Sequence, residues 1–186
     1  VSDVTAGMYG AAYRIIDAAF IPVRALLYAS YPRFFQEGSR GLVAAGRFAR
    51  RLLLPALAVV SGMALVLLVL GPWVPKLLGE GFRGSHEVVL WLLPILFFRV
   101  LHYFSADALT GSGYQGVRTA LQLGVAMLNL VLSLWLIPLW GWKGAAVASW
   151  ASDGALAMGL WLALWGFSLK EAVAMKKKGV LWKKRY

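Results

Sequence analysis

Five long apolar runs constrain the fold of this 186-residue chain more than any other feature. Each run is long enough to cross a hydrocarbon core of roughly 30 Å, which takes about 20 helical residues. In lipid only helices and closed barrels satisfy their backbone hydrogen bonds, and the runs lack the alternating pattern of barrel strands. The sequence therefore predicts an all-α, polytopic transmembrane helix bundle, with helices at about 5–31, 52–73, 88–109, 119–139 and 144–167.

Composition supports lipid as the solvent of this chain. Hydrophobic residues make up 60% of it, and a soluble domain this short could not bury so much apolar surface. The chain has no cysteine, which excludes a disulfide framework and a thiolate metal site. We expect one transmembrane domain at 1–168, followed by a basic tail at 169–186. No charged leader precedes the first run, so we expect the natural protein to continue upstream.

The formal net charge of +11 is distributed as in a membrane protein. Segments rich in arginine or lysine, at 32–51 and in the tail, alternate with connections poor in basic residues. By the positive-inside rule, Ser39 and Lys177 should face the cytoplasm and Gly81 the outside, in a multi-pass protein of the cell inner (cytoplasmic) membrane. Arg118 falls in a connection on the inner side. Anionic membrane lipids explain the cytoplasmic tail, so no nucleic acid is expected as partner.

The first apolar run carries charges inside its length. Arg14, Asp17 and Arg24 share one helical face by their spacing. An arginine at mid-membrane costs about 3 kcal/mol on insertion scales and usually faces a cavity or a partner. Arg14 and Asp17 could pair with each other, whereas Arg24 could reach the inner headgroups. Arg14 is expected to matter most, and Pro22 should kink the helix.

Later runs add further polar candidates. Arg99 and His102 share a face of the third run, and His102 is expected to be a bundle residue rather than a proton relay. Asn129 could bond between helices or contact substrate. Asp153 could couple an ion or partner an arginine, beside a stripe of small residues that predicts close packing. The candidate cavity residues are Arg14, Asp17, Arg24, Arg99, Asn129 and Asp153.

Catalytic signals are weak. Gly111, Gly113 and Gly116 fit the spacing of a dinucleotide fingerprint, but an apolar helix precedes them and no strand does. The two histidines are too far apart for a helical metal pair, and the sequence offers no Ser-His-Asp set. The sequence thus predicts no catalytic residue, no metal, no cofactor and no enzymatic activity.

Several short motifs, in this order, resemble those of bacterial polysaccharide flippases. The resemblance covers the chain up to its tail and is most specific in the late hairpin, at 137–146. These flippases are O-antigen-type exporters of the multidrug, oligosaccharidyl-lipid and polysaccharide exporter superfamily. The motifs are GMYGAAYR at 7–14, LGP at 70–72, LGEGF at 78–82, ALTGSG at 108–113 and IPLWGWKGAA at 137–146.

The resemblance implies a twelve-helix transporter of the multidrug and toxin extrusion type, with this chain covering most of the second half. The missing N-terminal half would be its partner around a cation-lined cavity. The implied function is flipping of a polyprenyl-pyrophosphate-linked oligosaccharide for lipopolysaccharide or other surface polysaccharide. Alternating access is the implied mechanism, driven by a coupling ion, proton or sodium. Arginine suits such a substrate because its guanidinium matches phosphate oxygens bidentately.

Three rival functions are also compatible with the sequence. A multidrug or lipid-linked peptidoglycan-precursor exporter of the same superfamily is the nearest, although a site for cationic drugs should show carboxylates rather than arginines. A membrane-embedded glycosyl- or acyltransferase would need a catalytic cluster, for which Asp107 with His102 is a poor candidate. A membrane scaffold without transport is disfavoured by the charges inside the apolar runs.

Overall fold

The structure, a computed structural model, describes residues 3–73 and 84–183. Within these ranges the chain forms helices joined by short turns and no strand, which confirms the predicted all-α bundle. The loop motif at 78–82 and Gly81 lie outside the described residues. The helices are α1 (Asp3–Ala19), α2 (Ile21–Gly38), α3 (Leu42–Leu70), the short 3-10 helix η1 (Gly71–Trp73), α5 (Ser85–Gly111), α6 (Gln115–Trp140) and α7 (Trp142–Lys183).

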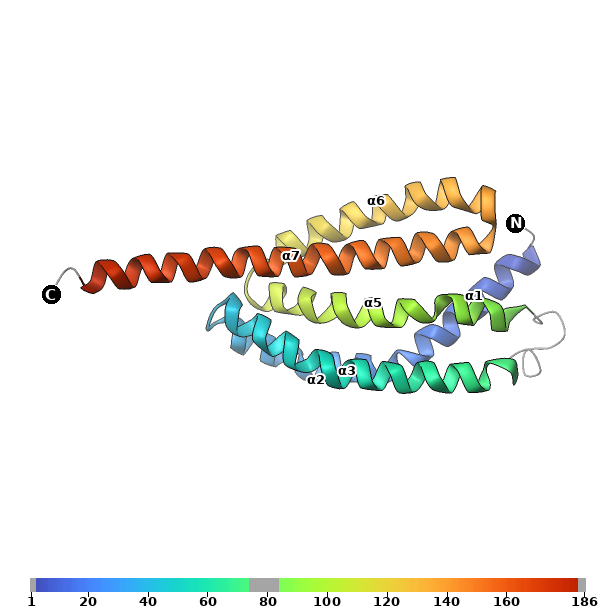
Figure 1. The fold of residues 1–186 in the computed structure, drawn as a ribbon, viewed down its shortest axis with the longest axis horizontal. Helices are drawn as coiled ribbons and strands as arrows, with labels where there is room; N and C mark the ends of the chain where they lie inside the picture. The colour runs from blue at the N-terminus through green and yellow to red at the C-terminus, as the bar shows by residue number, and fades with distance from the viewer. Residues whose placement is uncertain (1–2, 74–83, 184–186) are drawn as a thin grey trace.

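Helix α5 is the centre of the bundle (Figure 1). It packs against α1, α2, α3 and α7, and most of its residues from Val88 to Leu109 are buried. Helix α6 packs chiefly on α7 at the outside of the bundle and buries only Leu136. Helix α1 crosses the others obliquely, whereas α7 extends beyond them towards the C-terminus. Side chains from α1, α5 and α7 can therefore meet around one central helix.

Four segments are long and apolar enough to cross a membrane: Leu42–Trp73, Ser85–Gly111, Gln115–Trp140 and Trp142–Ala174. They contain the predicted runs at 52–73, 88–109, 119–139 and 144–167 and indicate a membrane protein. Each helix is longer than predicted, because flanking polar residues continue it. Helix α3 thus includes Arg47, Arg50 and Arg51. Helix α7 runs on without a break past 168, after which the tail was expected to begin.

The predicted first span at 5–31 is wrong as a single helix. The chain breaks at Phe20 into α1 and α2, and neither helix is long and apolar enough to span a membrane by itself. Pro22 lies in the first turn of α2, where its missing N–H and its ring disrupt the preceding turn. The predicted kink is therefore confirmed as a full helix break. Phe20 is buried there, its ring centroid 5.7 Å from that of Tyr103.

Glycine sets the distance between two pairs of helices. A Cβ atom on Gly111 would overlap the carbonyl of Phe34, so the backbones of α2 and α5 touch at this point. A Cβ atom on Gly144 would likewise overlap the carbonyl of Leu136, where α7 turns back along α6. Such contacts let membrane helices gain dispersion energy that apolar burial cannot supply in lipid.

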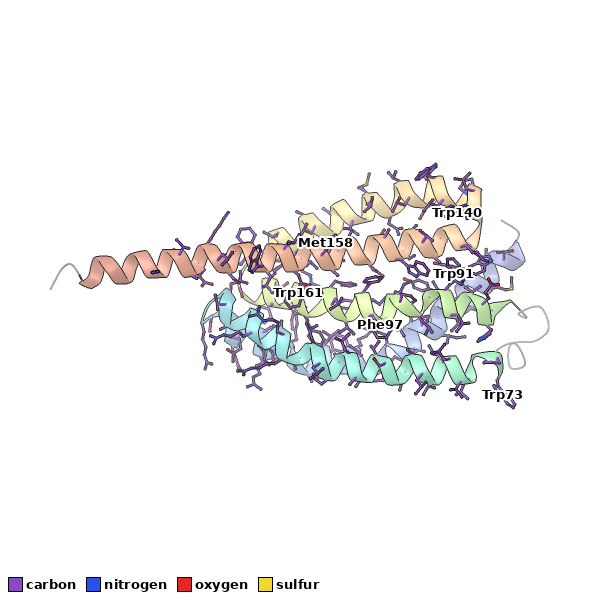
Figure 2. All side chains as sticks on the ribbon, in the orientation of Figure 1. Trp73, Trp91, Phe97, Trp140, Met158 and Trp161 are labelled. Atoms are coloured by element: carbon purple, nitrogen blue, oxygen red, sulfur yellow. The ribbon has the colours of Figure 1, made fainter. Side chains whose placement is uncertain are left out.

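The outer surface of the bundle is apolar along α3 and α6. Its large exposed side chains include Leu54, Leu65, Leu123 and Leu134. Trp73 and Trp140 lie at the same end of the bundle (Figure 2), as expected of an interfacial aromatic belt. A surface of this kind fits lipid rather than water.

Candidate functional site

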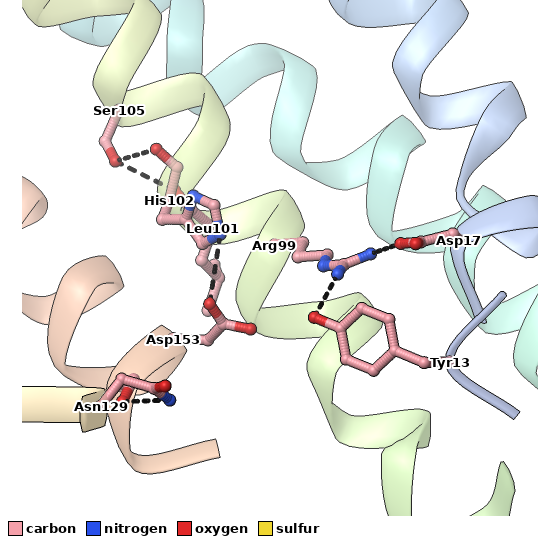
Figure 3. A network of polar contacts seen from close by, with 9 residues as sticks. Tyr13, Asp17, Arg99, Leu101, His102, Ser105, Asn129 and Asp153 are labelled. Atoms are coloured by element: carbon pink, nitrogen blue, oxygen red, sulfur yellow. Dashed lines mark hydrogen bonds and ion pairs between the residues drawn. The ribbon is translucent and has the colours of Figure 1, made fainter. Parts of the chain in front are cut away.

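A network of charged and polar side chains lies where α5 meets α1 and α7 (Figure 3). The Nη1 atom of Arg99 donates a hydrogen bond of 2.5 Å to Oδ1 of Asp17, and Nη2 donates one of 2.7 Å to the hydroxyl of Tyr13. The Arg99 side chain is only 12% exposed, against 42% for Asp17. Its guanidinium carbon also lies 5.2 Å from the centroid of the Tyr13 ring. The arginine charge is thus both paired and hydrogen-bonded, as a charge inside a bundle requires.

The α1 side of this network follows from helical spacing. Tyr13 and Asp17 lie four positions apart and so project from one face. Ala12 and Ile16, next to them, are fully buried, and α1 packs on α5. The apolar residues therefore fix the rotation of α1, and this rotation aims Tyr13 and Asp17 at Arg99.

One helical turn further along α5, His102 faces α7. Its Nε2 atom lies 3.8 Å from Oδ1 of Asp153, which is too long for a hydrogen bond, and the contact is ionic only when the imidazole carries a proton. The indole of Trp161 donates a 2.9 Å hydrogen bond to the Leu101 carbonyl and ties α7 to α5. On the far side of α7, the amide nitrogen of Asn129 lies 3.1 Å from the Ser152 hydroxyl. Of the charged residues Asp17, Arg99 and Asp153, Asp153 is the one that forms no hydrogen bond with the described residues.

A second polar site lies beside the break between α1 and α2. Arg24 lines a cavity of about 210 Å³ together with Asp107 and Arg118. Nη1 of Arg118 lies 3.3 Å from Oδ1 of Asp107 and donates a 2.9 Å hydrogen bond to Thr110. Arg24 is half-buried and forms no ion pair with any residue that the structure describes. Aromatic and apolar side chains complete the wall: Phe20, Leu27, Tyr28, Tyr31 and Tyr103.

The structure separates the predicted candidates into three groups. Asp17, Arg99 and Asp153 belong to the network around α5, and Arg24 belongs to the cavity. Asn129 forms a bond between α6 and α7, one of its two predicted roles.

Arg14 stands apart from these groups. It is exposed on α1 and forms no ion pair with the described residues. The predicted pairing of Arg14 with Asp17 is wrong, because Asp17 faces α5 and binds Arg99 instead. Asp153 lies beside His102 and forms no ion pair with an arginine of the described residues.

Two functional candidates were missed from the sequence. Tyr13 lies one turn before Asp17, and this spacing was the signal that could have placed it in the network. Arg118 was assigned to a connection, but it lies in the first turn of α6 and reaches back to Asp107. No local pattern indicates the contact between Arg118 and Asp107, because it depends on how α6 turns away from α5.

Comparison of this chain with protein-family models, with curated proteins and with solved structures finds no match. Among the residues that the structure describes, no three His, Asp or Glu side chains converge to hold a metal ion. What the two sites offer is a paired charge network and, beside it, an arginine that faces a cavity.

Proposed function

We propose that this chain belongs to a membrane transporter that flips a polyprenyl-pyrophosphate-linked oligosaccharide by alternating access. One observation carries the proposal. Arg24 is a half-buried arginine without an ionic partner among the described residues, and it lines a cavity beside a broken helix. Charges in such places are expensive and are usually retained for binding or transport.

The helix break supports a transport role. Transporters commonly bind their substrates where membrane helices are discontinuous, because the break frees backbone groups and allows one part to move against another. Here Phe20, at the break, and Arg24, in the next turn, line the same cavity. A substrate bound to Arg24 would thus contact the point at which the first segment can bend.

The charge of the cavity supports an anionic substrate. Its one carboxylate, Asp107, is already bound by Arg118, so the charge of Arg24 stays uncompensated within the described wall. A guanidinium can bind two phosphate oxygens at once. A cavity of about 210 Å³ suits a phosphate headgroup rather than a whole oligosaccharide. The sugars would therefore extend past Tyr28, which is 72% exposed.

The network around Arg99 supplies candidates for ion coupling. Asp17 of α1 and Asp153 of α7 both face α5. Asp17 is bound to Arg99, and Asp153 lies 3.8 Å from His102. Carboxylates inside a bundle mark ion or proton pathways in many transporters. We propose that a proton or sodium ion acts at Asp153, the more weakly held of the two. The rival cationic-drug exporter is less well supported, because the carboxylate in the cavity is occupied by arginine.

The test uses the full-length protein in a strain that lacks its own copy of the gene. Surface glycan and lipid-linked oligosaccharide on the inner leaflet are measured, normalised to the amount of protein in the membrane. Arg24→Gln should reduce surface glycan at least about tenfold at a normal amount of protein in the membrane, because the variant loses one charged hydrogen-bonding group. Arg24→Lys should recover part of the activity, because it keeps the charge without the planar fork.

The matched control is Arg50→Gln, which removes an exposed arginine of α3 outside the cavity. It should leave surface glycan unchanged. Full activity of Arg24→Gln would contradict the proposed role, and normal surface glycan in the deletion strain would contradict the proposed function.

Arg14 is tested in the same assay. Its position inside the first apolar run predicts that Arg14→Ala abolishes flipping at unchanged abundance. Its exposure in the structure shows that any such loss would not come from a broken contact within the described bundle. Full activity of Arg14→Ala would assign this side chain to the lipid surface.

A further inference from the structure

A groove between α2 and α3 concentrates positive charge at the end of the bundle where these helices join. Its volume is about 350 Å³, and it holds four arginines against one acidic residue. The lining residues are Arg33, Glu37, Arg40, Ala44, Arg47, Phe48 and Arg51. The carboxylate of Glu37 lies 3.4 Å from Arg40, whose side chain is 73% exposed. Three guanidinium groups therefore line the groove without a carboxylate partner in the described part of the chain.

The hairpin that carries the groove is held in a defined shape. Gly41 turns the chain with a φ of 113°, which a residue with a side chain rarely adopts. Glu171 of α7 accepts a 2.8 Å hydrogen bond from the N–H of Leu42 and so caps α3. Across the groove, the guanidinium carbon of Arg33 lies 5.1 Å from the centroid of the Phe48 ring. The arginines are thus presented by an ordered hairpin.

The spacing of these arginines favours a bound anion. Arg47 and Arg51 lie four positions apart on α3, where like charges repel each other. An anion between them would remove this repulsion and accept bidentate hydrogen bonds from guanidinium groups. The oxygens of a phosphate ester have the geometry for such bonds.

The surface next to the groove is apolar and continues along the same face of α3. Leu54 is 78% exposed one turn after Arg51, and Leu65 is 62% exposed farther along. Leu65 also belongs to an open apolar cleft of about 740 Å³ between α3 and α5, whose walls include Leu93 and Phe97. A polar groove therefore gives way to an apolar cleft along one helix that is long enough to span the membrane. This order matches the headgroup and acyl chains of a phospholipid.

We propose that the groove between α2 and α3 binds an anionic phospholipid. The arginines hold its phosphate, and its acyl chains lie along α3 towards the cleft with α5. Basic clusters at the end of a membrane helix attract anionic lipid in general, but here the groove adds a defined place for one headgroup. The site is separate from the cavity of Arg24 and does not depend on the proposed transport function.

The test is native mass spectrometry of the purified full chain in detergent. The probes are dioctanoyl phosphatidylglycerol, dioctanoyl phosphatidylcholine with the same acyl chains, and inorganic phosphate. We expect saturable binding of one phosphatidylglycerol and much weaker binding of phosphatidylcholine. The Arg47→Gln/Arg51→Gln variant should weaken phosphatidylglycerol binding at least about tenfold, since each surface arginine contributes to binding an anionic headgroup.

The matched control is Arg50→Gln/Lys176→Gln, which removes the same charge from exposed positions outside the groove. It should change binding by less than about threefold, because screened charges outside the site contribute little. Equal loss in both variants would overturn the proposal in favour of general electrostatic attraction. Equal binding of phosphatidylcholine would overturn it too, and so would full competition by inorganic phosphate at low millimolar concentration, which would assign the groove to free phosphate.

Folding is checked by helical circular dichroism without added lipid. If the glutamine variant does not fold, Arg47→Lys/Arg51→Lys decides the question, because it keeps both charges. Weaker binding of phosphatidylglycerol at unchanged helicity would support a guanidinium site. Unchanged binding would overturn it.

Discussion

The guanidinium of Arg99 lies 2.5 Å from the carboxylate of Asp17, although 82 positions separate the two residues in the chain. This contact ties the oblique helix α1 to the central helix α5. The Arg99 charge is mostly buried, whereas Asp17 is partly exposed, so Asp17 mainly compensates the cost of the buried guanidinium. Removing one partner should therefore lower the free energy of unfolding more than removing both partners.

Asp17→Asn should lower the free energy of unfolding by about 1–3 kcal/mol, because Arg99 keeps its charge and loses its partner. The double variant Asp17→Asn/Arg99→Gln should lose less than the single variant. Unfolding in mixed detergent and SDS measures both values. Arg14→Gln is the control, since Arg14 lies on the same helix but is exposed. Additive losses in the double variant would show that the pair contributes no coupling energy.

Gly111→Ala should destabilise the bundle by about 1–3 kcal/mol, because the added methyl group would overlap the Phe34 carbonyl. The shift should appear in the midpoint of thermal unfolding in detergent. Gly116→Ala is the matched control, because nothing lies within 4 Å of a Cβ atom at that position. Equal midpoints for the two variants would mean that α2 and α5 can move apart without loss of stability.

Glu171→Ala should speed hydrogen exchange at the amides of Leu42 and Val43, since Oε2 of Glu171 accepts bonds of 2.8 and 3.4 Å from them. Loss of such a cap typically costs about 0.5–2 kcal/mol. Glu171→Gln keeps a carbonyl acceptor and should exchange at an intermediate rate. Exchange that is the same in all three proteins would place α7 away from the α2–α3 turn in solution.

The topology prediction can be tested because the chain has no cysteine. Ser39 and Glu87 are exposed. The turn between α2 and α3, which holds Ser39, and the start of α5, which holds Glu87, lie at opposite ends of the bundle (Figure 1). By the arginine and lysine asymmetry, a membrane-impermeant maleimide should label Glu87→Cys in intact cells and Ser39→Cys only after lysis. The reverse labelling pattern would invert the topology.

The sequence by itself determined the fold class and located four of the long apolar helices, whereas the first predicted span is two shorter helices. In lipid the backbone must satisfy its own hydrogen bonds, so an apolar run of sufficient length dictates a helix whatever its neighbours are. The break near Pro22 was also predictable, because the missing N–H of proline acts within one turn. Assignment to a flippase stays a prediction, since it rests on short motifs whose resemblance no comparison supports.

The tertiary structure alone decided the partners of the charged residues. Periodicity placed Arg14, Asp17 and Arg24 on one face, but the structure gives them three different surroundings: an exposed surface, an arginine of α5 and a cavity. A helical pattern states which residues share a face, not which way that face turns. That rotation is set by the burial of Ile16 and Phe20 and by the break that redirects α1. The burial depends on packing between helices far apart in the sequence, which no local pattern encodes. Pro22 marks where the break falls but not the direction that α1 takes from it.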